Sequence, residues 1–574
     1  MRLYNYAHTL LPSWQDYRSA RPTRRGDLVA GITVGIVALP LALAFGVSSG
    51  AGAASGLVTA IVAGIIAAVF GGSNIQVSGP TGAMVVVLGP IVAAHGPGAV
   101  ALVSLMAGVV VATAGVLKIG RIVSYIPWPV IEGFTLGIAV IIFLQQVPAA
   151  IGTKAGPSSN AFVAATLSFG QLNPGTIFWT LAAVVVVALL MVLLPRIHPQ
   201  LPGSIIAIIV VSVTANLANL PLARIGLLPH SLPMPSLPAL DAATSISLIG
   251  PALTVAALAA IESLLSARVA ASISDSGPYD ADRELFGQGL ASIASGFFGG
   301  MPATGAIART AVNVRSGAQT RMAAIVHALV LVTVVYLAAG VVGQIPLAAL
   351  SGVLMVTATR MISLATVRSV VRSTRADATV FIVTALITVS FDLIIAVGIG
   401  IAVAAFFTLR TLANSGGVHR EELPFPARAE DDQIAIFRLD GALFFGAADR
   451  MLERVTRIRN VRVVILRMSQ LQVLDATGAR TITDMVTGLE RRGITVLIKG
   501  IQPEHLGLAT RVGVLTSLRH QKHLFASLDD AVEHARSHVA RATAKQELKN
   551  VLPDPDYKQR LHLATAPTDL SHGQ

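Results

Sequence analysis

The sequence predicts an α-helical polytopic membrane protein with fourteen transmembrane segments, followed by a small α/β domain. Of its 574 residues, 53% are hydrophobic and 13% are charged, whereas a typical soluble domain has about 25% charged residues. The mean hydropathy is +0.71. Residues 1–413 contain 31 charged residues and residues 414–574 contain 41. The first part therefore has the composition of a membrane domain, and the second part that of a soluble domain.

The composition also excludes several classes of function. The chain has no cysteine, so disulfide frameworks, cysteine-ligated zinc and thiol nucleophiles are absent. Most of the net charge of +12 lies in residues 1–413, with 20 Lys and Arg against 11 Asp and Glu. Such an excess is typical of cytoplasmic loops, and we expect no nucleic-acid partner. No local signature of an ATPase, zinc protease or serine hydrolase is present, so neither a pump nor an enzyme is predicted.

The transmembrane segments are predicted from apolar runs of about 20 residues. The arginine-rich segment 1–27 is expected in the cytoplasm, and residues 28–413 form the transmembrane domain. Two further segments, 79–94 and 303–314, are short and interrupted by glycine and proline. An even total of fourteen returns the C-terminus to the cytoplasmic side, so we expect a multi-pass protein of the cell membrane. The twelve longer segments are 28–47, 55–71, 98–117, 127–147, 175–194, 202–220, 247–269, 285–300, 321–343, 346–360, 376–391 and 393–412.

The two interrupted segments repeat one motif. Residues 80–84 are Pro-Thr-Gly-Ala-Met and residues 302–307 are Pro-Ala-Thr-Gly-Ala-Ile, so that Thr81 and Thr304 are 223 residues apart. The same offset carries the start of the first segment to the start of the eighth. Seven segments per half is an odd number, so the halves cross the membrane in opposite directions. Interrupted segments at corresponding positions of such inverted repeats mark the binding site of a transporter.

Each break is expected to start a half-helix inside the membrane. Unpaired N–H groups there cost several kcal/mol, and two facing helix N-termini attract an anion. An alternative is that both breaks are packing kinks. The candidate substrate-binding residues are Ser78, Gly79, Thr81 and Gly82 at the first break, and Thr304, Gly305, Ala306 and Arg309 at the second.

Glu262 is an ionisable residue in the middle of the eighth segment, which makes it a functional candidate. It can bind Na⁺ together with Ser266, it can take up a proton, or it can serve only as a structural hydrogen-bonding group. Arg309 can face the anion or pair with Glu262. The acidic residues between 275 and 284 are expected in a solvated loop.

The soluble part alternates strands with helices, which predicts a small α/β domain over residues 430–540. A tail over residues 541–574 has no sustained apolar period and is expected to be disordered. The predicted strands are 433–440, 441–445, 462–467 and 494–499, and the predicted helices are 447–459, 476–491, 503–511 and 529–540.

Four motifs, at residues 27–40, 76–84, 260–265 and 302–310, resemble the SulP family of anion transporters, the prokaryotic relatives of the solute carrier 26 proteins. The soluble part resembles the STAS domain of that family. The resemblance implies a seven-plus-seven inverted repeat, a homodimer in the lipid bilayer, and elevator-type movement. It also implies that a small anion is held between segments 1, 3, 8 and 10.

Within the family, residues 39–45, 56–59 and 78–82 look most like the bicarbonate-transporting branch, which is coupled to Na⁺. By position, the resemblance implies a Na⁺ site of Thr81, Glu262, Ser266 and Thr304. The branch has an aspartate where this chain has Glu262, and the longer carboxylate is common in members coupled to protons. The coupling ion therefore stays open between Na⁺ and H⁺, and no other cofactor is expected.

Bicarbonate is the first substrate hypothesis, and sulfate or a dicarboxylate is the second. An uncoupled anion channel and a membrane sensor that signals through the soluble domain are rival hypotheses. Residues 474–478, Leu-Asp-Ala-Thr-Gly, resemble the phosphorylated loop of anti-sigma-factor antagonists, which implies a regulatory phosphosite at Thr477. The interpretation that we favour is that Asp475 only caps the following helix.

Overall fold

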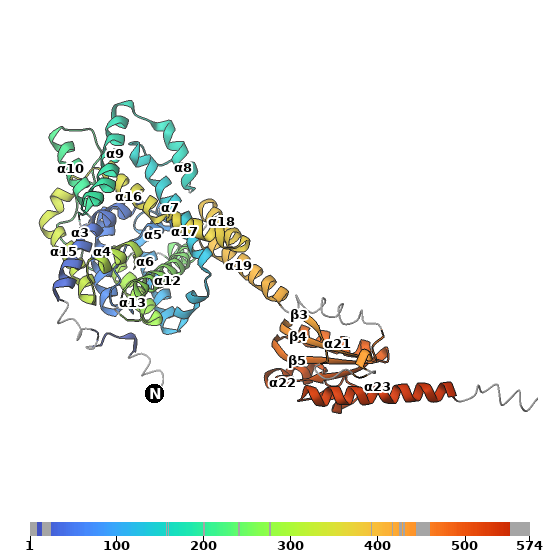
Figure 1. Cartoon of the computed structure of the whole chain (residues 1–574). Helices are drawn as coiled ribbons and strands as arrows, with labels where there is room; N and C mark the ends of the chain where they lie inside the picture. Colours follow the sequence, from blue (N-terminus) through green and yellow to red (C-terminus); the bar gives the residue numbers. More distant parts are fainter. Residues whose placement is uncertain are drawn as a thin grey trace, which may run out of the picture. The chain divides into compact units, whose positions relative to one another are not determined.

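The computed structural model divides the chain into two compact units, Met1–Ala404 and Ala405–Gln574 (Figure 1). The predicted domain limits at 413 and 430 differ from this division and stay predictions. The structure describes residues 9–13, 16, 24–156, 158, 160–198, 201–238, 242–274, 277–391, 393–415, 417–423, 428, 431–443 and 460–551.

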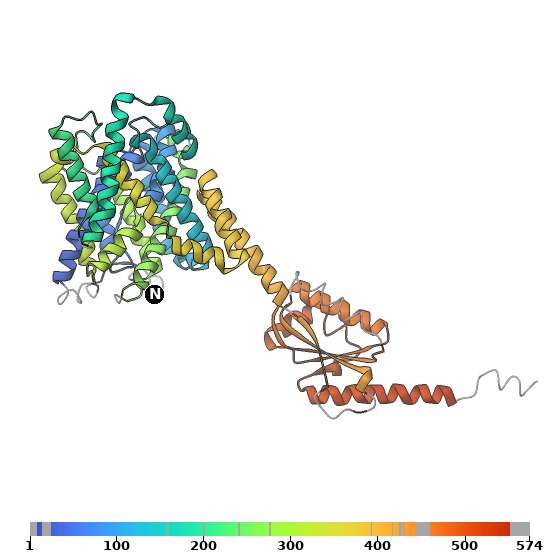
Figure 2. The same cartoon turned by 45° about the horizontal axis from the view of Figure 1, so that its top comes forward.

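The first unit is a helical bundle (Figures 1 and 2), and each of the fourteen predicted segments overlaps one of its helices. Nine helices in the described part of the chain are long and apolar enough to span a membrane. The number of crossings stays a prediction. The helices are α3 (Arg24–Ser48), α4 (Ala53–Phe70), α5 (Gly82–His95), α6 (Ala99–Val116), α7 (Trp128–Ala150), α8 (Ala161–Ser168), α9 (Pro174–Ile197), α10 (Gly203–Leu217), α11 (Ala242–Ser247), α12 (Ile249–Ser272), α13 (Ala281–Phe297), α14 (Ile307–Arg315), α15 (Arg321–Val342), α16 (Leu347–Met361), α17 (Leu364–Ser373), α18 (Arg375–Ser390) and α19 (Leu393–Ser415).

The internal repeat is visible in the packing of these helices. The offset of 223 residues carries α3 onto α12, α4 onto α13, α5 onto α14 and α6 onto α15. Helix α6 packs on α13, and the equivalent pair α15 and α4 also pack together. The pairs α12–α6 and α3–α15 are related in the same way. The two halves therefore exchange equivalent contacts, as expected of a two-fold repeat.

The two breaks meet in a short antiparallel sheet at the centre of this repeat. Strand β1 (Ser78–Gly79) pairs with β2 (Thr304–Gly305), with Ser78 opposite Gly305 and Gly79 opposite Thr304. Helix α5 follows β1 with 14 residues, and α14 follows β2 with 9 residues. At about 1.5 Å per residue, both helices are shorter than a hydrocarbon core of about 30 Å. They are the predicted half-helices.

The second unit is a five-stranded sheet of order β3-β4-β5-β6-β7, with β3 antiparallel and the others parallel. Its strands are β3 (Gly417–Glu421), β4 (Ile434–Leu443), β5 (Val463–Leu474), β6 (Thr495–Lys499) and β7 (Leu524–Phe525). Its helices are α21 (Ala476–Arg491), α22 (Pro503–Val512) and α23 (Leu528–Val551), with short 3₁₀ turns such as η4 (Gln521–His523).

Alternating side chains build a separate core on each face of this sheet. On β5, Val464 packs in one core with Ile482 of α21. Its neighbours Val463 and Ile465 pack in the other core with Val532 of α23. Since successive residues of a strand point to opposite faces, α21 and α23 cover opposite sides of the sheet.

Two predictions for the second unit differ from the structure. The strands predicted at 433–440 and 441–445 are one strand, β4, because Gly441 adopts a positive φ of 73° within shifts of the strand register. Residues 541–551, predicted as a disordered tail, continue helix α23, since Ala, Lys, Gln and Glu are good helix formers. The helix predicted at 447–459 and the rest of the tail lie outside the described residues.

The favoured interpretation of the Asp475 loop agrees with the structure. Asp475 is the N-cap of α21, and its Oδ1 accepts a hydrogen bond from the backbone N–H of Gly478 at 2.7 Å. The side chain of Thr477 is exposed. Phosphorylation of Thr477 stays a prediction.

A buried ion pair ties α23 to the start of β4. Arg536 donates from Nε and Nη2 to the two carboxylate oxygens of Asp431 at 2.9 and 2.8 Å, and both side chains are more than nine-tenths buried. The Arg536 guanidinium lowers the pKa of the Asp431 carboxyl. The pair therefore stabilises the unit above the ordinary aspartate pKa of about 3.9, and this stability is lost as the pH falls through the lowered value.

We expect Asp431→Asn to destabilise the second unit by about 3 kcal/mol at pH 7, because it removes the buried counter-ion of Arg536 and leaves the exposed Glu533 carboxylate, 3.9 Å from Nη1. Scanning calorimetry of the full chain at pH 7 and in steps from pH 4 to pH 2 measures this, and the difference from wild type shrinks below about pH 4. Asp484→Asn is the matched control, because the Arg480–Asp484 pair is exposed and is worth less than about 1 kcal/mol. Equal effects of the two substitutions would contradict the assignment.

Candidate functional site

Two helix N-termini come together at the β1–β2 sheet. Thr81 is the N-cap of α5 and Ala306 is the N-cap of α14, and neither helix start has a side-chain cap. Each N-terminus carries roughly half a positive charge. The first turns of both helices can therefore donate to an anion from opposite sides of the sheet.

Glu262 lies on α12 against both breaks. Its Oε2 accepts hydrogen bonds from Thr81 Oγ1 at 2.7 Å and from Thr304 Oγ1 at 2.8 Å. The two threonine hydroxyls are 3.1 Å apart. Among the described residues, Oε1 of Glu262 accepts no hydrogen bond. The structure thus brings together one carboxylate and two hydroxyls that are equivalent in the internal repeat.

Arg309 lies in the first turn of α14 and is buried, at 2% exposure. Its Nη2 donates to the backbone oxygen of Pro80 at 2.5 Å. Within the described residues, Nη1 is buried and has no hydrogen-bond partner, and no ion pair within 4.0 Å joins Arg309 to Glu262. Both predicted roles of Arg309, facing the anion and pairing with Glu262, stay predictions.

Gly79 makes room for the guanidinium. Its φ is +151°, and a Cβ at this position would lie 2.7 Å from Arg309 Nη1 and 3.3 Å from the Cα of Ala60. A positive φ and a close neighbour are the two conditions that favour glycine.

Other predicted site residues already form hydrogen bonds or contacts with neighbouring protein groups. The N–H of Gly305 donates to Ser263 Oγ at 3.1 Å, and the N–H of Ala306 donates to the Val77 oxygen at 2.9 Å. Ser78 Oγ accepts a hydrogen bond from Gln288 Nε2. Ser266 Oγ lies 3.4 Å from Thr310 Oγ1, so Ser266 contacts the neighbouring α14 rather than Glu262. These contacts brace the two breaks.

Three supporting residues were missed in the sequence. Ser263 and Gln288 hold β2 and β1 respectively. Glu284, predicted in a solvated loop, is 1% exposed on α13, where its Oε2 accepts from the N–H groups of Gly72 and Ser73 at 2.8 and 3.1 Å. That prediction is wrong because the acidic cluster runs into the first turn of an amphipathic helix, whose inner face is buried.

A cavity of about 430 Å³ lies along the same helices. Its walls include Val86 and Ile91 of α5, Ile141 of α7, and Pro251 and Thr254 of α12. Thr254 is eight residues before Glu262, a distance of about 12 Å along a helix. The candidate site residues do not line this cavity, which lies beyond them toward the C-terminal end of α5.

The comparisons with known proteins agree with this geometry. The model of the sulfate permease family matches residues 25–384. The chain belongs to this family. The STAS domain model matches residues 426–531, so the second unit is a STAS domain and the protein is an anion transporter of the SulP family. Because the family and its relatives are transporters, an enzymatic function is not indicated.

Curated relatives include two kinds of transporter. The chain is 34% identical over 516 residues to the putative sulfate transporter YvdB of Bacillus subtilis, covering 88% of this chain and 96% of the relative. It is 30% identical over 507 residues to the bicarbonate transporter BicA of Synechocystis, covering 83% of this chain and 88% of the relative. This chain is therefore similar, over most of its length, to a putative sulfate transporter and to a bicarbonate transporter.

The fold is shared with a solved structure over nearly the whole chain. The structure of the murine solute carrier 26 family member A9 anion transporter superposes with a TM-score of 0.80 at 17% identity, covering 93% of this chain and 95% of that chain. This likeness confirms the predicted fold class, a helical transporter domain followed by a STAS domain.

Proposed function

We propose that this family member takes up bicarbonate together with Na⁺ by alternating access. One observation carries the proposal. A single carboxylate oxygen of Glu262 is shared by Thr81 and Thr304, one residue from each of the two breaks that precede the half-helices. Binding of a cation at Glu262 and of an anion at the half-helix N-termini would therefore reorganise the same hydroxyls.

Na⁺ suits this oxygen cluster. It is a hard cation that takes carboxylate, hydroxyl and carbonyl oxygens, like the other hard cations of proteins. Oε1 of Glu262 and the second lone pairs of both threonine hydroxyls remain available as ligands. A proton on Oε1 is the alternative, since a carboxylate in a membrane span can also be neutralised by protonation. In either case the anion and the cation partly neutralise each other.

Bicarbonate suits the anion side of the site. The N–H groups at the start of α5 and α14 and the unpaired Nη1 of Arg309 are donors to anionic oxygens. Hydroxyls both donate and accept, so Thr81 and Thr304 can also accept the O–H of bicarbonate, a proton that sulfate lacks. The likeness to the BicA relative supports the same substrate.

Sulfate is the second candidate. The relative with 34% identity is named a putative sulfate transporter. Helix N-termini with an arginine can also hold a dianion. A sulfate transporter with Glu262 as its proton site is the form that this alternative takes.

The orientation of the protein in the membrane is inferred from its positive charges. Arginines precede α3, and Arg368 and Arg372 lie on α17 between α16 and α18. We place these positive groups and both termini in the cytoplasm. As the resemblance to the family implies, we propose that a core containing α3, α5, α12 and α14 moves against the rest of the bundle, and that the protein is a homodimer.

Uptake into proteoliposomes tests the proposal. Labelled bicarbonate and labelled sulfate are offered at the same external pH, each with an inward Na⁺ gradient, an inward proton gradient or no gradient. We expect bicarbonate accumulation that requires Na⁺. Accumulation of sulfate with protons would establish the alternative, and bicarbonate flux without accumulation would identify a channel.

The threonines provide a second test. Thr304→Val removes the hydroxyl at nearly constant volume, and we expect the Na⁺ concentration for half-maximal uptake to rise about tenfold, since one polar ligand of a charged group is lost. Thr304→Ser keeps the hydroxyl and is the matched control, with a change of less than about threefold. Equal Na⁺ dependence of the valine and serine variants would exclude Thr304 from the cation site.

A further inference from the structure

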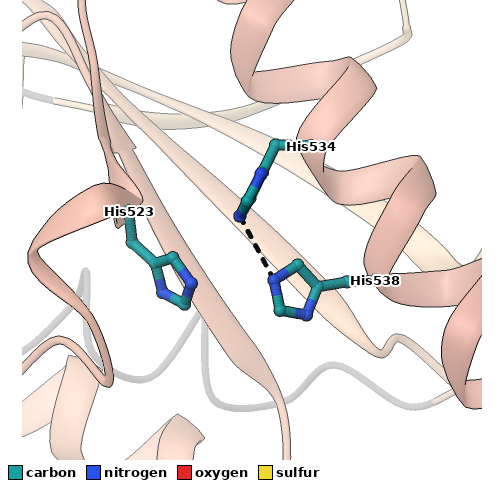
Figure 3. A group of neighbouring side chains, drawn as sticks. All are labelled: His523, His534 and His538. Atoms are coloured by element: carbon teal, nitrogen blue, oxygen red, sulfur yellow. Dashed lines mark hydrogen bonds between the residues drawn. The ribbon is translucent and has the colours of Figure 1, made fainter.

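Three histidines lie close together in the STAS domain. His523 ends the 3₁₀ turn η4, directly before β7. His534 and His538 lie one turn apart on α23. One nitrogen from each of the three rings can be chosen so that all three atoms lie within 4.8 Å of one another. Figure 3 shows the rings converging, His523 from the sheet side and the other two from the helix.

The local geometry is close to that of a metal centre. His534 Nε2 and His538 Nε2 are 3.2 Å apart. In a tetrahedral zinc site with Zn–N distances of about 2.0–2.1 Å, two ligand nitrogens are about 3.3 Å apart. The ring centroids of His523 are 5.6 Å from His534 and 5.4 Å from His538. A three-nitrogen face would be complete once a nitrogen of His523, now within 4.8 Å of the other two, lay about 3.3 Å from them.

The availability of the nitrogens points the same way. His523 is 1% exposed, and within the described residues its buried Nδ1 has no hydrogen-bond partner. No described residue therefore fixes the tautomer of this ring, which leaves either ring nitrogen of His523 able to act as a ligand. His534 and His538 are half-buried, so an ion can reach the group from solvent.

The protonation state also suits metal binding. Burial lowers the pKa of His523 to about 4, and the neighbouring His538, His534, His520 and Arg519 contribute to this shift. Burial and Arg541 likewise lower the pKa values of His534 and His538. The three imidazoles are therefore neutral at pH 7, which is the form that binds metals. The two arginines have acceptors of their own, since Arg519 pairs with Glu490 and Arg541 donates to Ser537.

We propose that His523, His534 and His538 form a binding site for a transition-metal dication, with Zn²⁺ as the first candidate. Neutral imidazole donors without a carboxylate favour Zn²⁺, Cu²⁺ or Ni²⁺ over Mg²⁺ and Ca²⁺. Three protein ligands leave the fourth tetrahedral position to water or to a ligand supplied by a partner.

Such an ion would join two parts of the domain that pack only through side chains. His523 belongs to the edge of the sheet next to β7, whereas His534 and His538 belong to α23, which covers one face. Metal binding would therefore fasten α23 to the sheet edge. The ion would stabilise the folded domain by an amount that grows with the logarithm of its free concentration, once this exceeds the dissociation constant.

The test uses the full chain in detergent, purified without a polyhistidine tag and stripped with a chelator. After dialysis against Zn²⁺, we expect one tightly held equivalent per chain by elemental analysis. Replacement by Co²⁺ should produce the strong visible absorption of a tetrahedral site. We expect His534→Gln and His538→Gln each to weaken Zn²⁺ binding at least tenfold, because even the loss of a group that only orients a ligand costs about 10- to 100-fold.

Two controls keep the result interpretable. His419→Gln changes an exposed histidine of β3, outside the group, and should leave Zn²⁺ affinity unchanged. Circular dichroism melting without metal reports whether each variant is folded. Zn²⁺ should raise the melting temperature of wild type and of His419→Gln, but not that of the His534→Gln, His538→Gln double variant. The proposal is overturned if wild type holds no stoichiometric Zn²⁺, or if a folded His534→Gln, His538→Gln double variant binds it as tightly as wild type.

Discussion

Glu262→Gln is expected to abolish cation-coupled accumulation of the anion. The amide keeps the size of the side chain, but it removes the charge that would hold Na⁺ and the carboxylate that accepts both threonine hydroxyls. Loss of such charge-assisted interactions costs about 1.5–3 kcal/mol, which corresponds to a fall of about 10- to 150-fold in coupled uptake. Proteoliposome uptake with and without a Na⁺ gradient measures this fall.

Glu132→Gln is the matched control. Glu132 is a second glutamate on a transmembrane helix, near the start of α7, and its described partner is Trp128 Nε1 at 2.9 Å. It lies outside the site, so uptake should stay within about twofold of wild type. If Glu262→Gln is fully expressed and still accumulates anion against its gradient, Glu262 is not the coupling residue.

Gly79→Ala is expected to cause the second large effect. The alanine must adopt a φ near +151° and must displace the guanidinium of Arg309, which its Cβ would approach to 2.7 Å. Backbone strain of this kind costs about 1–3 kcal/mol. We expect transport to fall at least about tenfold, since 1.4 kcal/mol corresponds to a factor of ten, and the melting temperature to fall with it.

Gly89→Ala on helix α5 separates this effect from a general intolerance of glycine substitution. A Cβ at Gly89 meets no atom within 4 Å, and alanine is the better helix former. This control should retain wild-type uptake and stability. Wild-type transport by Gly79→Ala would show that the close contact between the first break and Arg309 is not required.

The sequence was sufficient to predict a helix at each of the fourteen segments and the meeting of the two breaks, whereas the short helices α8, α11 and α17 were missed. Apolar runs decide where helices form in a membrane, because the cost of unpaired backbone groups leaves few alternatives. The shared motif and the offset of 223 residues related Thr81 to Thr304, and the structure places their hydroxyls 3.1 Å apart. Glu262 was identified by the rarity of charge in a span, and its contacts with both threonines follow from the same repeat.

The direction of individual side chains could not be predicted in the same way. Ser263 and Ser266 are both small polar residues near Glu262, and only the packing of α12 against β2 and α14 decides which one braces Gly305. The burial of Glu284 depends on contacts with the distant residues Gly72 and Ser73. Such long-range contacts leave no local pattern in the sequence.

The histidine group was missed for a related reason. His534 and His538 have the one-turn spacing that places two ligands on one helix face, and this signal was available in the sequence. His523 reaches them only because β7 and α23 pack together, at a sequence separation that no motif specifies. The predicted strand break near Gly441 failed because glycine can continue a strand through a local irregularity.

Movement of Na⁺ driven by the anion tests the central claim most directly, because thermodynamic coupling acts in both directions. Proteoliposomes that contain no Na⁺ are placed in labelled Na⁺ at one low concentration, the same in both arms. One arm has an inward bicarbonate gradient and the other has none, at constant pH. We predict that the bicarbonate gradient drives labelled Na⁺ inward through wild-type protein and not through Glu262→Gln. Bicarbonate entry without any movement of Na⁺ would contradict the account.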